Sequence, residues 1–303
     1  MKTLFKIFLS QLFFLIACSA LLTAGPKAGF SMPDSLLEVT FGYRSVRNLI
    51  LLPVTINDTI KVNLILDTGC RNLVLFGKRF SKLFDLHPDK KIQFSGLGAG
   101  KPVLGSLSLG NKVSINAVIG ENIPVVIVPN QNLFGSFPTA DGVIGYDIFI
   151  KFEVELNLAR QLITFRPAFT AELPSAYKKI SIRVENSTPI ISSVVFFRGK
   201  EGQLCDLMID TGSALGLLLK TSDLEKYPTE GQSRVLGRGL NGNIEGTQAI
   251  AEKLLLDHLE ITAISAGIIY SPWHNYASVG MDIMKNYSII LNYCKAYAGF
   301  KKA

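Results

Sequence analysis

Apolar runs of strand length recur along the chain and are separated by short polar or glycine-containing segments. The runs 49–58 and 59–67 meet at Asn57-Asp58, which predicts a β-hairpin because both residues favour the backbone of tight turns. A second hairpin is predicted within 179–197. Helical signals are scarce. The pattern therefore predicts an all-β fold with few short helices.

One apolar run occurs twice in nearly the same form. LILDTGC occupies 64–70 and LMIDTGS occupies 207–213. In each, a buried strand is predicted to lead into Asp-Thr-Gly, where the glycine permits a tight turn. A carboxylate at the end of a buried strand is costly unless it is paired or hydrogen-bonded. The repetition suggests that Asp67 and Asp210 meet, whereas the simpler alternative is that each aspartate only caps its own turn.

The segments that close the two halves of the chain are also alike. Residues 142–165 align without a gap with residues 277–300, at a constant offset of 135. The simplest account is an internal duplication that gives each half one aspartate. The predicted divisions are a leader with the start of the mature chain at 1–24, an irregular lead-in at 25–44, an N-terminal lobe at 45–167, a linker at 168–178 and a C-terminal lobe at 179–303.

The duplicated motif resembles that of the bilobal aspartic peptidases, the retropepsin-like and pepsin-like group, over about residues 45–300. The resemblance implies two pseudo-symmetric, β-barrel-like lobes with Asp67 and Asp210 as the catalytic dyad. Two neighbouring carboxylates share one proton, so the ionised member can activate a water while the protonated member donates to the substrate carbonyl. The implied substrate is a peptide or protein bound by strand addition, with no cofactor or metal.

The residues beside each aspartate carry further predictions. The resemblance implies that Thr68 and Thr211 brace the two turns against each other. Gly69 and Gly212 are expected to let the backbone approach the carboxylates closely.

At the next position the two halves differ, because Cys70 stands where the second half has Ser213. The resemblance implies that a serine here bonds the outer oxygen of its aspartate, which a thiol does only weakly, so the dyad is predicted to be asymmetric. Cys70 is interpreted as a buried substitute for alanine, with a redox switch as the alternative.

Two glycine-rich segments, 94–111 and 237–246, are candidates for flaps that cover the substrate. The first contains no tyrosine, although pepsin-like flaps usually carry one. In this respect the sequence resembles the retropepsin-like members found in the bacterial envelope more than it resembles pepsin itself. The candidate flap glycines are Gly96, Gly98, Gly100, Gly239 and Gly242.

The N-terminal segment predicts export, because the positively charged Lys2 and Lys6 precede an apolar stretch at 7–17, as in a signal peptide. All its interpretations place the body of the protein outside the cytoplasm, in the cell envelope or periplasm or secreted.

The manner of attachment is left open by this segment. Residues 15–18, LIAC, resemble a bacterial lipoprotein box, which would make Cys18 the lipidated first residue of the mature chain and anchor it to the membrane. The alternatives are cleavage near Ala24 and an uncleaved anchor over 4–24.

Charge and composition restrict the partners. The net charge is +7, but the basic residues are scattered, which argues against a nucleic-acid site. The three histidines are far apart and show no zinc-ligand spacing. One aspartate per half makes a monomer sufficient for the site. Two functions follow: an active aspartic endopeptidase, or a catalytically weak peptide-binding or scaffold protein on the same fold.

Overall fold

The structure is a computed structural model that describes residues 28–303, apart from 95, 97, 99, 130–138, 224, 225, 229 and 272–275. The leader at 1–24, with Cys18, and the first residues of the lead-in lie outside the described residues. Within the described part, no helix is long and apolar enough to cross a membrane. Strands dominate, and the helices are short: η1 (Lys78–Lys82), α2 (Tyr146–Phe149) and α3 (Met281–Met284).

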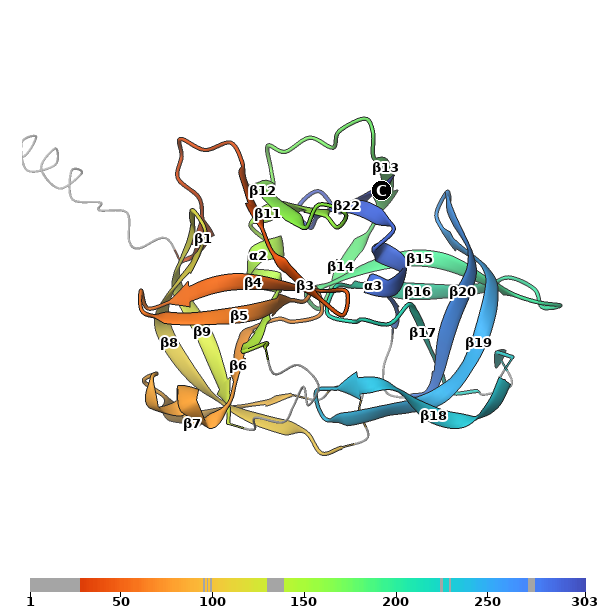
Figure 1. Cartoon of the computed structure of the whole chain (residues 1–303), viewed down its shortest axis with the longest axis horizontal. Coiled ribbons are helices and arrows are strands. Elements are labelled where there is room, and N and C mark those ends of the chain that lie inside the picture. The colour runs from red at the N-terminus through yellow and green to blue at the C-terminus, as the bar shows by residue number, and fades with distance from the viewer. Residues whose placement is uncertain are drawn as a thin grey trace, which may run out of the picture.

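In the first lobe, six strands among the described residues close into a ring (Figure 1). The hydrogen-bonded order is β9-β6-β10-β5-β4-β8, and β8 pairs again with β9. Alternate side chains point into the ring and form most of the core of this lobe. The ring strands are β4 (Leu49–Ile56), β5 (Ile60–Leu66), β6 (Leu73–Phe76), β8 (Val103–Ile115), β9 (Val118–Val128) and β10 (Gly142–Ile144).

The second lobe repeats this ring strand for strand in the described chain, in the order β20-β17-β21-β16-β15-β19, with β19 pairing to β20. The prediction of two barrel-like lobes built from a duplicated sequence is thus confirmed. The ring strands are β15 (Thr188–Phe197), β16 (Gln203–Asp210), β17 (Leu217–Thr221), β19 (Gly242–Leu256), β20 (Leu259–Tyr270) and β21 (Ala277–Gly280).

Both predicted hairpins are present. Asn57 and Asp58 form the β4–β5 turn with positive φ angles of 50° and 61°. The second hairpin joins β14 (Arg183–Glu185) to β15 through Asn186 and Ser187, which also have positive φ. In each lobe a strand outside the ring forms one arm of the hairpin that carries the flap glycines: β7 (His87–Phe94) pairs with β8, and β18 (Glu230–Gly239) pairs with β19.

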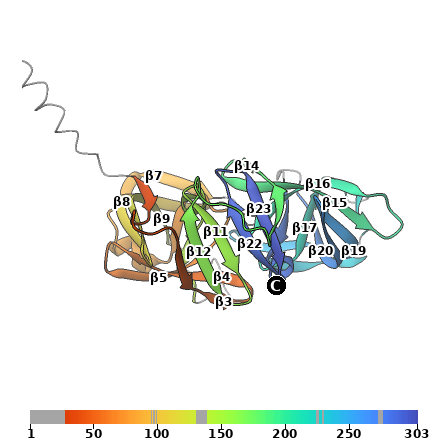
Figure 2. The ribbon, with the colours of Figure 1, turned by 90° about the horizontal axis from the view of Figure 1, so that it is seen from above.

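A third, six-stranded sheet joins the two lobes within the described residues (Figure 2). Its order is β13-β23-β22-β11-β12-β2, so each half supplies three strands and the duplicated strands β11 and β22 pair antiparallel at the centre. This order relates the two halves by an approximate twofold axis. The strands are β2 (Val39–Gly42), β11 (Phe152–Asn157), β12 (Leu162–Pro167), β13 (Lys178–Ser181), β22 (Tyr287–Asn292) and β23 (Tyr297–Lys302).

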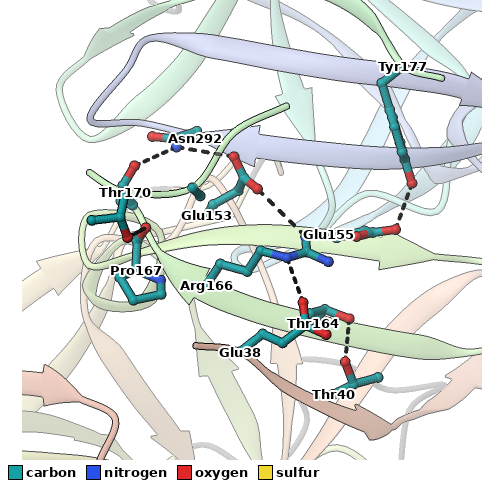
Figure 3. Close-up of polar contacts among 12 residues, drawn as sticks. Glu38, Thr40, Glu153, Glu155, Thr164, Arg166, Pro167, Thr170, Tyr177 and Asn292 are labelled. Atoms are coloured by element: carbon teal, nitrogen blue, oxygen red, sulfur yellow. Dashed lines mark hydrogen bonds and ion pairs between the residues drawn. The ribbon is translucent and has the colours of Figure 1, made fainter. Parts of the chain in front are cut away.

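A buried ionic network lies on one face of this sheet (Figure 3). The Glu153 side chain is fully buried; it accepts hydrogen bonds from the Asn292 amide (3.2 Å) and the Tyr297 hydroxyl and lies 3.6 Å from the Arg166 guanidinium. Arg166 also pairs with Glu155 at 2.8 Å. Because a buried charge without its partners is costly, these contacts favour one fixed pairing of the two halves.

The lead-in at 25–44 was predicted to be irregular, and its described part shows that this prediction is wrong. β1 (Gly29–Ser31) pairs with β9, and β2 pairs with β12 of the joining sheet. β3 (Arg44–Val46) begins at the last residue of the lead-in and pairs with β4. Phe30 of β1 and Phe41 of β2 are buried, so burial of a few apolar side chains on existing sheets fixes these short strands.

Candidate active site

The two Asp-Thr-Gly turns are positioned by equivalent strands. Asp67 follows β5, and its backbone N–H donates to the Ile144 carbonyl of the parallel strand β10 (2.8 Å). Asp210 ends β16 and pairs in register with Gly280 of β21. Gly145, directly after β10, and Gly280, the last residue of β21, leave no room for a side chain: a Cβ added at Gly145 would lie 1.9 Å from the Asp67 carbonyl oxygen. These glycine segments therefore pack directly beneath the turns.

Thr68 and Thr211 lock the two turns together. Each threonine N–H donates to the Oγ1 of the other at 3.0 Å. Each hydroxyl then donates to a carbonyl of the opposite lobe: Thr68 to Ile209 (2.6 Å) and Thr211 to Leu66 (2.8 Å). Both side chains are fully buried. The reciprocal bonds hold the turns of the two lobes face to face.

The two carboxyl groups lie over the glycines of the turns. Within each turn the glycine N–H donates to its aspartate: Gly69 to Asp67 Oδ1 (2.7 Å) and Gly212 to Asp210 Oδ1 (3.0 Å). Gly212 also lies directly against the carboxyl group of the opposite lobe, since a Cβ added at Gly212 would lie 2.3 Å from Asp67 Cγ. The carboxyl group of Asp67 thus rests on the second turn, where only glycine leaves space.

Burial and mutual repulsion keep a proton on this pair. Burial raises the pKa of Asp67, although the Gly69 N–H opposes the shift. Burial and then the charge of Asp67 raise the pKa of Asp210 to about 7. One carboxyl group of the pair is therefore protonated and the other ionised over a range of acidic to neutral pH.

This raised pKa predicts a stability change that can be measured. Between the ordinary Asp pKa of 3.8 and about 7, the native protein holds a proton that the unfolded chain has lost, so stability falls as pH rises through this interval. We expect Asp210→Asn to flatten this slope and to add about 2–4 kcal/mol to the unfolding free energy at pH 7, with little gain at pH 4. Urea unfolding at several pH values measures this; an unchanged slope would contradict the raised pKa.

Cys70 and Ser213 make the two turns unequal. The Cys70 thiol donates to the Asn72 carbonyl (2.8 Å), while the Ser213 hydroxyl accepts from the Leu215 N–H (3.3 Å). No described hydrogen bond joins the Ser213 hydroxyl to the Asp210 carboxylate, so the role implied for this serine is not seen. Burial and the charge of Asp67 raise the pKa of the Cys70 thiol well above its usual range. A thiol kept protonated is a poor redox switch, which favours the buried-substitute interpretation.

All five candidate flap glycines converge where two hairpin tips meet, and Asn241 joins them. The Asn241 side chain accepts from the Gly98 N–H (2.8 Å) and donates to the Gly100 carbonyl (3.0 Å), while its carbonyl accepts from the Gly100 N–H (2.7 Å). Additional Cβ atoms at Gly96 and Gly239 would lie 3.0 Å from Asn241 Oδ1 and 3.3 Å from the Gly98 nitrogen. Figure 1 places these tips on the side of the molecule opposite the joining sheet, with the ends of β5 and β16 between.

The contact between the tips predicts a role in retaining ligand. Asn241→Ala removes two side-chain hydrogen bonds, each worth about 1 kcal/mol, between the hairpins of the two lobes. We expect about a tenfold higher Kd for a peptide-like inhibitor, mainly through faster release. The control is Gln203→Ala, an amide on β16 that bonds only within its own exposed turn. Stopped-flow dissociation rates equal to wild type would show that the tips do not retain the ligand.

Three residues near the site were not found from the sequence. Asn241 had a local signal, the turn-forming Asn-Gly pair, but its contact partner lies in the other lobe. Tyr293 follows β22 and is buried; burial and the charges of both aspartates raise its pKa well above the usual range. Lys220 lies on β17, within the electrostatic reach of Asp210.

No group of three His, Cys, Asp or Glu side chains in the described chain is arranged to hold a metal ion. The three described cysteines, Cys70, Cys205 and Cys294, are free and half-buried.

Comparison with known families agrees with this geometry. Residues 52–148 match the family described as aspartyl protease. The match runs from β4 to α2, so it contains the first Asp-Thr-Gly turn and the glycine segment beneath it. A search of curated proteins gave no match. The match to the aspartyl protease family lies within the first lobe, and the second lobe, outside the matched residues, repeats the same turn and ring.

Proposed function

We propose that the protein is an aspartic endopeptidase that cleaves peptide bonds with a water activated by Asp67 and Asp210. The observation that carries the proposal is the reciprocal bonding of Thr68 and Thr211, which holds the two Asp-Thr-Gly turns face to face in one chain. A single copy of the chain then supplies both aspartates, so the reaction needs no second subunit.

The chemistry follows from the shared proton. The ionised carboxylate takes a proton from the water as its oxygen attacks the peptide carbonyl, and the protonated carboxyl group donates to the carbonyl oxygen. The product of this step is a tetrahedral diol without a covalent bond to the protein. The diol collapses as the C–N bond breaks: the leaving amine takes a proton from the pair, and one hydroxyl of the diol returns its proton to the pair as it becomes part of the new carboxyl group. Water is the only co-reactant, and the carboxyl groups end with the single proton that they held at the start.

Substrate binding is assigned to the space between the turns and the hairpin tips. An extended peptide can add its backbone to the flap hairpins as a further strand, which orients the scissile bond across the pair. The contact through Asn241 must open to admit a chain and can close again over it. Such closure excludes water other than the attacking molecule.

The alternative of a catalytically weak peptide-binding or scaffold protein rested on Cys70 and on the missing flap tyrosine. Neither feature removes an aspartate, a threonine of the reciprocal pair or a glycine beneath the carboxyl groups. No observed contact favours the alternative over the peptidase.

The test is a degradation assay with the purified protein. A mixture of denatured proteins is incubated between pH 3 and 8, with and without a peptide analogue that carries a hydroxyl group in place of the scissile carbonyl. We expect new peptide termini at acidic to neutral pH, and their suppression by the analogue, because it mimics the diol. Absence of new termini at every pH, or cleavage that the analogue leaves unchanged, would overturn the proposal.

A further inference from the structure

Lys220 occupies an unusual place for a charged residue. It lies on β17, the strand that follows the second Asp-Thr-Gly turn, and its side chain is half-buried. Burial lowers the pKa of Lys220 to about 8, and the nearby charge of Asp210 opposes that shift. Among the described residues, its ammonium group makes no hydrogen bond or ion pair. A half-buried cation that makes no direct hydrogen bond or ion pair is costly, which suggests that a directly bound partner arrives with a ligand.

The strand pattern shows which way the side chain points. Leu217 and Leu219 face the main core of the lobe, whereas Leu218 lies on the other face of β17. Because side chains alternate along a strand, Lys220 shares the face of Leu218. Leu218 belongs to a small apolar cluster that includes Leu215 of the second turn, Leu236 of β18, Ile244 of β19 and Ile269 of β20.

This cluster connects the second turn with the flap hairpin: Leu218, Ile244 and Ile269 are buried, and the partly exposed Leu215 and Leu236 complete it. We call it the wall of the second lobe, because it lies on that lobe's side of the region between the turn and the hairpin. Ile269, a member of the cluster, pairs in register with Lys220 across β17 and β20. The apolar stem of Lys220 therefore runs beside this wall, and its charged end extends the wall with a positive group.

The equivalent position in the first lobe is apolar. Val143 pairs with Val74 in the first lobe, and the duplicated Ser278 pairs with Leu218 in the second. This register makes Lys220 the counterpart of Phe76, which is buried. The proposed reaction uses one aspartate from each lobe. A lysine that is present in the second lobe alone is therefore not needed for the reaction of Asp67 and Asp210. An unequal pair of walls can distinguish the two directions of a bound peptide.

We propose that Lys220 is a specificity residue that binds an acidic side chain of the peptide substrate on the wall of the second lobe. This inference rests on the proposed function and deepens it by naming a substrate class. A Glu or Asp side chain accepts hydrogen bonds from the ammonium and neutralises it in a partly dehydrated place, where a charge pair is stronger than in water. An uncharged Gln or Asn leaves the ammonium unneutralised.

The experiment compares peptides that differ by one charge. A cleavable peptide is synthesised with Glu or Gln in turn at each of several positions around the scissile bond, and kcat/KM is measured for wild type, Lys220→Met and Lys220→Arg. Met keeps the apolar stem and removes the charge. The control is Lys226→Met, which removes an exposed lysine of the same lobe. Cleavage of the all-neutral peptide shows that each variant is folded and active.

We expect wild type to prefer Glu over Gln about tenfold at one position, Lys220→Met to lose this preference, and Lys220→Arg and Lys226→Met to keep it. A wild type that prefers Glu nowhere, or a preference that survives in Lys220→Met, would overturn the role of Lys220. If wild type cleaves no peptide, the proposed function fails. Binding of the same labelled peptides, measured by fluorescence anisotropy, then tests the role of Lys220 separately. Tighter binding of a Glu peptide by wild type but not by Lys220→Met supports the role, and equal binding refutes it.

Discussion

Replacing either Asp67 or Asp210 by Asn is expected to slow peptide cleavage by at least roughly 10²–10⁴-fold while leaving the protein folded. Asn keeps the size of the side chain and can still accept from the glycine N–H of its turn, but it cannot exchange the proton that the reaction needs. The reciprocal threonine bonds do not involve the carboxyl groups and should persist. The measurement is kcat/KM with a fluorogenic peptide, with circular dichroism to check the fold.

The double variant sharpens this expectation. Because the two groups act as one unit, Asp67→Asn with Asp210→Asn should be no slower than the slower single variant. Asp34→Asn, at an exposed site in the lead-in, is the matched control and should retain full activity. Near-normal rates in both single variants would show that the pair is not the catalyst.

Gly212→Ala should have the second largest effect, although it changes no ionisable group. The added Cβ would lie 2.3 Å from Asp67 Cγ and 2.5 Å from Asp67 Oδ1, so the carboxyl group or the turn must move. A displacement of about 1 Å at a reacting group can reduce the rate about 10²-fold. We therefore expect a loss of at least that size in kcat, measured at saturating peptide.

Gly42→Ala provides the comparison, since the nearest atom to its added Cβ is 3.9 Å away on the outer strand β2. It should leave kcat unchanged. Full activity in Gly212→Ala would mean that the carboxyl group of Asp67 does not rest on the second turn.

The fold and the two turns could be predicted because their signals are local and duplicated. Apolar runs that end in Asp-Thr-Gly define the strands and turns, and the constant offset between the closing segments gives the same order of strands twice. The hairpin at Asn57-Asp58 follows from residues that tolerate positive φ. In these places sequence pattern, turn geometry and burial all favour the same structure.

Features that depend on partners far along the chain could not be predicted in the same way. β1 and β2 are strands only because β9 and β12 offer free edges, so their short sequences looked irregular. Asn241 gained its role from the opposite hairpin tip, and Lys220 from its position on one face of β17. The family resemblance implied that Ser213 bonds its aspartate, but the Leu215 N–H bonds the hydroxyl instead.

The central claim is that a water between Asp67 and Asp210 attacks the peptide directly. It is tested by a single turnover of a peptide in ¹⁸O-enriched water, quenched in acid and followed by mass spectrometry of both products and of the intact protein. The predicted result is one ¹⁸O atom in the new C-terminal carboxyl group and no mass added to the protein at any time. A peptide fragment covalently attached to the protein, or no product at all, would contradict the account.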